Sequence, residues 1–128
     1  MTFGTFDLFH PGHKYYLSEA RKLWDELITV VARDATVEKI KGKKPRENEL
    51  SRLKKVQDAH IASQVVLGSK DLPYAVIEEY QPDILCFGYD QKSFNDERLQ
   101  KFLTQHHLSP KIIILPAFEA DRWKSSKL

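Results

Sequence analysis

The sequence predicts an α/β fold in which a parallel sheet is covered on both faces by helices. Short runs rich in β-branched residues alternate with longer segments whose apolar residues recur at helical spacing. The strand-like runs are almost continuously apolar, which is typical of parallel strands buried on both faces. With 128 residues, the chain has the length of one domain, and we expect a single domain over residues 1–128.

Five segments have the character of buried strands. The second, ELITVVAR, is the longest, and the first is very short and ends at Gly4. The expected strands cover residues 1–4, 26–33, 64–67, 83–87 and 111–115. Five parallel strands covered on both faces would make a three-layer sandwich with a five-stranded parallel sheet.

Four segments between these strands have helical spacing. Pro11 suits a first helical turn, because its missing N–H group costs nothing there. The expected helices cover residues 11–24, 46–59, 72–81 and 95–107. Parallel sheets bind ligands at the carboxyl ends of their strands. The loops after Phe3, Arg33 and Phe87 should therefore meet at the binding edge.

Composition excludes several classes of function. The chain has 20 Lys and Arg against 18 Asp and Glu. A net charge of +2 is too low to be typical of a protein that binds the phosphates of a nucleic acid. Cys86 is the only cysteine, which excludes an intramolecular disulfide and a cysteine-based zinc site. No apolar run approaches the ~20 residues needed to span a bilayer. We expect a cytoplasmic protein that binds neither nucleic acid nor membrane.

Residues 4–13, GTFDLFHPGH, are the most informative stretch. Gly4 permits a tight turn and close backbone approach after the first strand. The N–H groups and dipole of the helix that follows would attract an anion. His10 and His13 are three residues apart, so they would lie near one face and suit a polyphosphate. The alternatives are a packed helix start with one solvated histidine, or a metal pair, for which no third ligand lies nearby.

This string resembles the signature of the cytidylyltransferase-like nucleotidyltransferases, with its GTFD turn and HxGH box. The similarity continues along most of the chain. VARDATVEKIKGKKP resembles the segment after strand two in the FAD synthetase-like branch of this family. FGYDQ at 87–91 resembles its nucleotide-binding loop, and KSSK at 124–127 resembles its Ser/Thr-rich motif. The resemblance implies a Rossmann-like fold and transfer of a nucleotidyl group from ATP or CTP to a phosphate monoester, with release of pyrophosphate.

By this resemblance, His10, His13 and Lys41 are the catalytic residues, with Lys43 or Lys44 as alternatives to Lys41. The nucleotide would be bound by the following residues: Gly4, Thr5, Phe6, Gly88, Asp90, Ser125 and Ser126. Mg²⁺ would arrive with the triphosphate, and no residue is assigned as a metal ligand. Asp7 either fixes its loop or approaches Mg²⁺. Residues 33–46 are expected to form a flexible basic loop that closes over the substrate, with Gly42 in it.

The first choice of substrates is FMN with ATP. The alternatives are CTP with glycerol 3-phosphate, and a nucleotide-binding module that lacks turnover. Two departures weaken the glycerol 3-phosphate reading: His60 and Ser63 stand where that branch has arginine and aspartate, and Arg122 lies only three residues before Ser125. A homodimer is possible, because members of the family are often dimers.

Overall fold

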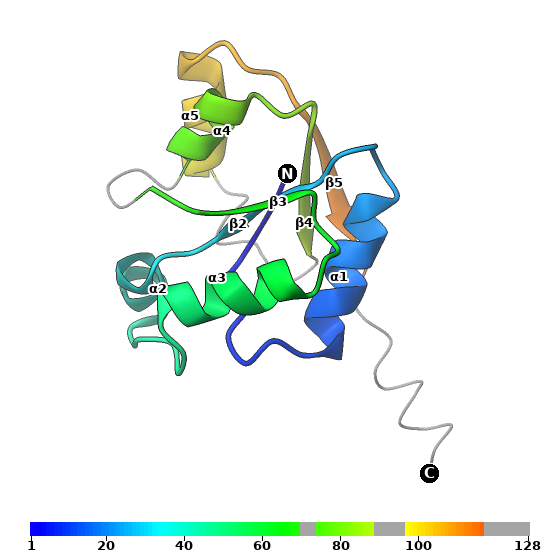
Figure 1. Cartoon of the computed structure of the whole chain (residues 1–128). Helices are drawn as coiled ribbons and strands as arrows, with labels where there is room; N and C mark the ends of the chain where they lie inside the picture. The colour runs from blue at the N-terminus through cyan, green and yellow to red at the C-terminus, as the bar shows by residue number, and fades with distance from the viewer. Residues whose placement is uncertain (70–73, 89–96, 117–128) are drawn as a thin grey trace.

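The computed structural model has a five-stranded parallel sheet between helices, as the sequence predicts (Figure 1). The structure describes residues 1–69, 74–88 and 97–116. The strands are β1 (Thr2–Gly4), β2 (Ile28–Val31), β3 (Gln64–Leu67), β4 (Ile84–Gly88) and β5 (Lys111–Leu115). Their order across the sheet is β3-β2-β1-β4-β5.

The helices of the described part are α1 (Pro11–Arg21), α2 (Asp34–Lys41), α3 (Glu49–Asp58), α4 (Ala75–Tyr80) and α5 (Glu97–Gln105). The expectation of a flexible loop over residues 33–46 was wrong, because α2 occupies most of that segment. Only Thr36 and Val37 of α2 are buried, so its apolar pattern is too weak to stand out. Gly42 ends the helix in the left-handed conformation, with φ of 78°, which is a common helix stop.

Side chains alternate between the two faces of the sheet, and each face has its own core. Phe3, Leu85 and Phe87 pack on one side with residues of α4 and α5. Val31 and Cys86 point to the other side and pack with residues of α1 and α3. Figure 1 shows α4 and α5 together on one side of the sheet, away from α1 and α3. This alternation is the two-residue period of strands buried on both faces.

The strand order reverses at β1, and this reversal sets the position of the site. The chain steps outward from β1 through β2 to β3, then returns to β4 on the other side of β1. In such sheets the crevice for a ligand lies beyond the carboxyl ends of the strands where the order reverses. The segments that follow β1 and β2 border that crevice, and β4 ends there at Gly88. No helix in the described ranges has the length and apolar character that crossing a membrane requires.

Candidate active site

His10 and His13 together close the amino terminus of α1. His10 is the N-cap residue, and its Nδ1 accepts a hydrogen bond from the Gly12 N–H group at 3.1 Å. The His10 N–H group in turn donates to Nδ1 of His13 at 3.2 Å. The two imidazoles stack, with ring centroids 3.7 Å apart and planes 21° apart. This is a capping box in which histidines take the places that Ser or Thr and Glu or Gln usually hold.

The capping bonds determine which ring nitrogen carries the proton. A neutral imidazole whose Nδ1 accepts a hydrogen bond carries its proton on Nε2. Both rings accept at Nδ1, so each is an Nε2–H donor when neutral. His13 is held in place by the rings of Phe6 and Phe9, with centroids at 5.4 and 5.6 Å. The helix start therefore supplies two oriented side-chain donors beside its own N–H groups.

Gly4 has a packing role at the end of β1. A Cβ atom at this position would lie 2.7 Å from the ring of Phe6, which is closer than side-chain atoms tolerate. Phe6 is 2% exposed and belongs to the core on the α1 and α3 side of the sheet. The close approach that Gly4 permits is therefore that of the Phe6 ring.

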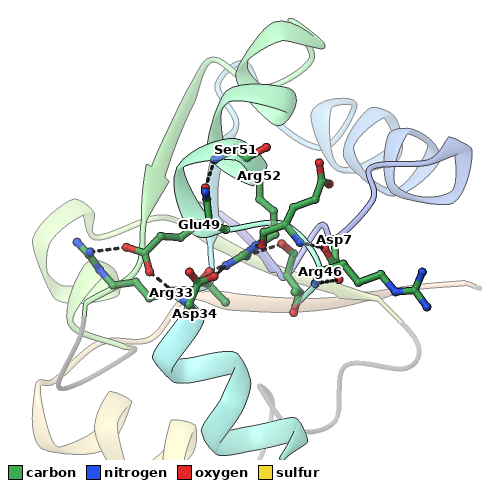
Figure 2. Close-up of polar contacts among 11 residues, drawn as sticks. Asp7, Arg33, Asp34, Arg46, Glu49, Ser51 and Arg52 are labelled. Atoms are coloured by element: carbon green, nitrogen blue, oxygen red, sulfur yellow. Dashed lines mark hydrogen bonds and ion pairs between the residues drawn. The ribbon is translucent and has the colours of Figure 1, made fainter. Parts of the chain in front are cut away.

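Arg52, on α3, lies at the centre of a polar network that sequence analysis missed (Figure 2). Its Nη1 donates to the carbonyl oxygens of Thr5 and Ala32, at 2.8 and 2.7 Å. Its Nε donates to the Glu47 carbonyl oxygen at 3.0 Å. Its Nη2 forms an ion pair with the Asp34 carboxylate at 2.6 Å. One side chain thus ties together the segments after β1 and β2, the start of α2 and the approach to α3.

Asp7 fixes its loop to the segment that precedes α3. Its carboxylate accepts from the backbone N–H groups of Arg46 and Glu47, at 2.8 and 3.0 Å. The Glu47 side chain binds the same loop, because its carboxylate accepts a hydrogen bond from the Leu8 N–H group at 2.9 Å. The Glu47 carboxylate also forms an ion pair with Lys55. Burial raises the pKa of Asp7, but the two backbone donors and the positive charges of Arg52 and Arg46 together outweigh it, and the pKa lies below its usual value. The carboxylate is therefore held in its charged form.

Glu49 joins the starts of α2 and α3. One of its carboxylate oxygens accepts from the Asp34 N–H group at 2.9 Å, where no side-chain cap of α2 itself is present. The other oxygen pairs with Arg33 at 3.0 Å. Arg33 also donates to the Gly68 carbonyl oxygen after β3, at 2.7 Å. A small pocket opens beside this group, and Gly4, Arg33 and Thr36 contribute to its lining.

The other predicted residues that the structure describes lie on or just after α2 and at the end of β4. Lys41 is the last residue of α2 and is exposed, as are Lys43 and Lys44. Gly88 was expected to follow strand four, but it is the last residue of β4 and pairs with Leu115. Asp90, Ser125 and Ser126 lie outside the described residues. Across residues 1–69, 74–88 and 97–116, no three His, Cys, Asp or Glu side chains are grouped to hold a metal ion.

His60 and Ser63, where the sequence departs from the glycerol 3-phosphate branch, lie near the amino end of β3. His60 follows α3, and Ser63 directly precedes β3. The Ser63 hydroxyl accepts from the Leu27 N–H group, just before β2, at 3.0 Å. Ser63 therefore links the amino ends of β2 and β3, whereas His10 and His13 follow the carboxyl end of β1.

Known proteins agree with the fold and with the motifs. The cytidylyltransferase-like family model matches residues 1–128. The FAD synthase of Aciduliprofundum boonei is 42% identical over 118 residues, which cover 92% of this chain and 78% of that protein. The FAD synthase of Thermoplasma acidophilum is 40% identical over 126 residues, covering 98% and 87% of the two chains.

A solved structure gives the same result. The lipopolysaccharide core biosynthesis protein from Thermoplasma volcanium superposes with a TM-score of 0.83 at 37% sequence identity. The match covers 92% of this chain and 95% of that one. The family model, the relatives and the shared fold place this chain in the cytidylyltransferase-like family, in the branch that contains these FAD synthases, and make it a nucleotidyltransferase.

Proposed function

We propose that this protein is an FMN adenylyltransferase, which transfers AMP from ATP to the phosphate of FMN. An oxygen of the FMN phosphate attacks the α-phosphorus of ATP, the bond to the bridging oxygen of the β-phosphate breaks, and FAD and pyrophosphate form. The choice of FMN and ATP rests on the FAD synthases that are about 40% identical over most of this chain.

The observation that carries the chemistry is the pair of capped histidines. With Nδ1 of each ring engaged by a backbone N–H group, the Nε2–H groups of His10 and His13 are set to donate to phosphate oxygens. The amino terminus of α1 adds its dipole and backbone donors. Negative charge builds on these oxygens as the pyrophosphate leaves. Losing one such preorganised donor costs roughly 10²–10³-fold in kcat.

The basic segment after β2 supports binding of the triphosphate. Residues 33–46 carry six basic side chains against two acidic ones. Lys41, Lys43 and Lys44 are exposed, and they follow one another at the end of α2. We assign the phosphate contact to Lys41. An exposed ammonium on a flexible stem can follow the phosphates as charge moves toward pyrophosphate.

We also propose that Mg²⁺ enters with the triphosphate. Mg²⁺ in nucleotide sites commonly binds substrate phosphates and water with one or two carboxylates, and a dedicated protein cage is not needed. Both oxygens of the Asp7 carboxylate already accept backbone N–H groups, so the triphosphate and water would supply most of the ligands of the ion. Bound in this way, the ion would neutralise part of the triphosphate charge.

Product analysis by chromatography tests the proposal. The purified chain is incubated with Mg²⁺ and either ATP or CTP, each with FMN or glycerol 3-phosphate, while pyrophosphate is measured in parallel. We expect FAD from ATP and FMN, and no FAD from the His10→Asn, His13→Gln double variant. Formation of CDP-glycerol from CTP would instead assign CTP and glycerol 3-phosphate as the substrates. Nucleotide binding without pyrophosphate from any pair would favour a binding module.

A further inference from the structure

Arg52 carries a full charge inside the protein. It is 0% exposed, and it is the only charged residue among the buried side chains of the described ranges. Desolvating a guanidinium costs several kcal/mol, and good pairing offsets this cost without ensuring a net gain in stability. An apolar side chain of similar volume would often serve packing alone as well or better. The placement of this charge therefore calls for a function other than packing.

The guanidinium lies where β1 and β2 separate. The ladder between these strands ends with Gly4 opposite Val31, followed by a bond from the Ala32 N–H group to the Gly4 carbonyl oxygen at 2.9 Å. The next carbonyl groups, those of Thr5 and Ala32, turn to Nη1 of Arg52 instead of to the other strand. Arg52 thus bridges the ends of the two strands at the edge where the ligand crevice opens.

Holding the Thr5 carbonyl also orients the next N–H group. In a trans peptide the C=O and N–H groups point in opposite directions, and the chain has no cis peptide among its described residues. The Phe6 N–H group therefore points away from Arg52. Phe6 has a positive φ of 56° and is 2% exposed. No group in the described ranges accepts a hydrogen bond from its N–H. A backbone donor left unpaired in this way is costly until a ligand supplies an acceptor.

We infer that Arg52 is a positioning residue, which aims the Phe6 N–H group at a phosphate oxygen of the bound triphosphate by fixing the Thr5 carbonyl. The inference rests on the proposed function for the identity of the ligand. Three nitrogens of the guanidinium are in use at once, on Thr5, Ala32, Glu47 and Asp34. The single ammonium of lysine cannot reproduce this planar fork, so Arg52→Lys keeps the charge and loses the geometry.

Selective labelling makes the Phe6 N–H group visible. The chain has seven phenylalanines, so a sample labelled with ¹⁵N-phenylalanine gives at most seven amide signals. The Phe6 signal is assigned by its absence in Phe6→Tyr. The probe is α,β-methylene ATP, which does not transfer its nucleotidyl group. We expect this probe to shift the Phe6 amide strongly in the wild-type protein and less than half as far in Arg52→Lys at saturation.

Steady-state kinetics supply the second readout. Arg52→Lys should lower kcat about 100-fold, the typical effect of one lost donor, with the KM for FMN within about threefold of wild type. Lys54→Ala is the matched control, because Lys54 is exposed on the same helix and contacts Asp58 at 3.6 Å. It should keep wild-type kinetics and the full Phe6 shift. A merely structural Arg52 would lower the melting temperature but leave kcat per folded molecule unchanged well below it.

The outcomes separate this inference from the proposed function. A full Phe6 shift in Arg52→Lys, or no shift in the wild-type protein with the probe bound, overturns the positioning role. A wild-type protein that shows the shift, and loses it in Arg52→Lys, but makes no FAD refutes the substrate assignment alone. If Arg52→Lys does not fold, Asp34→Asn tests the same link by removing the charge opposite Nη2. It should lower both kcat and the Phe6 shift, and unchanged values overturn the inference.

Discussion

The backbone N–H group of His10 donates to Nδ1 of His13 at 3.2 Å, and Nδ1 of His10 accepts from Gly12 at 3.1 Å. The Nδ1 atoms of both rings thus accept the hydrogen bonds that begin α1. The capping and the chemistry are divided between the two nitrogens of each ring, because Nδ1 caps the helix and Nε2 carries the donor proton.

This division can be tested by replacing the rings with amides that still cap. Asn is a favoured N-cap residue and Gln is a usual third-position partner in a capping box. His10→Asn and His13→Gln should therefore keep the free energy of unfolding within about 0.5 kcal/mol of wild type, whereas His10→Ala should lose about 1 kcal/mol. All three should lose turnover by about 100-fold or more. Urea denaturation and initial rates of pyrophosphate release measure the two effects. Near-normal rates in His13→Gln would remove the proposed role of its ring.

Lys41 is expected to act on the triphosphate. Lys41→Ala should raise the KM for ATP or lower kcat by about 10-fold while leaving the KM for FMN unchanged, because it removes one exposed cation from the phosphate end. Lys39→Ala is the matched control, since Lys39 is exposed on the same helix two residues earlier. Initial rates with each substrate varied in turn measure both constants. Unchanged ATP kinetics in Lys41→Ala would transfer the role to Lys43 or Lys44.

The features that were predictable from sequence depend on local patterns. Buried parallel strands and the helix that starts at Pro11 are visible as apolar runs and as a residue with a known positional preference. The pairing of His10 with His13 also follows from their spacing of three residues at a helix start. Each of these properties is set by neighbours in the chain.

Arg52 was not predictable for the opposite reason. In the sequence it is a basic residue in an amphipathic helix, next to Lys54 and Lys55, where solvent exposure is the usual outcome. Its burial depends on the carbonyls of Thr5 and Ala32, which are 47 and 20 residues away. The short helix α2 was missed because only two of its side chains reach the core. The contacts of Arg52 exist only once the sheet has brought Thr5 and Ala32 together.

Asp7 should make stability depend on acidity. Its pKa is lowered in the folded protein, so its contribution is fully present above the pKa of the unfolded chain and is lost as the pH falls through the folded value. Asp7→Asn should be less stable by roughly 1 kcal/mol at pH 7, and this difference should shrink between pH 5 and pH 3. Urea titrations at several pH values measure it.

Asp58→Asn is the control for this prediction. Asp58 is exposed on α3, with Lys54 3.6 Å away. An exposed pair of this kind contributes little to stability, so this variant should follow the wild-type protein across the same pH range. If Asp7→Asn also follows wild type, the bonds to Arg46 and Glu47 do not stabilise the loop.

Cys86 offers a way to measure nucleotide binding without any turnover. The thiol is 1% exposed on β4, opposite Thr2 of β1, and burial raises its pKa to about 11. It should therefore stay protonated at pH 8 and react with a thiol reagent such as Ellman's reagent only when the sheet opens.

Labelling of Cys86 at pH 8 should be complete within minutes in urea and should take far longer in the native protein. A ligand that binds only the closed form stabilises it by RT ln(1 + [L]/Kd), so a nucleotide at 100 times its Kd should slow labelling about 100-fold. ATP and CTP compared at one equal concentration rank the two nucleotides by affinity alone, because the tighter ligand slows labelling more. Rapid labelling of the native protein would mean that β4 is accessible, contrary to the packing of Cys86 against the residues of α1 and α3.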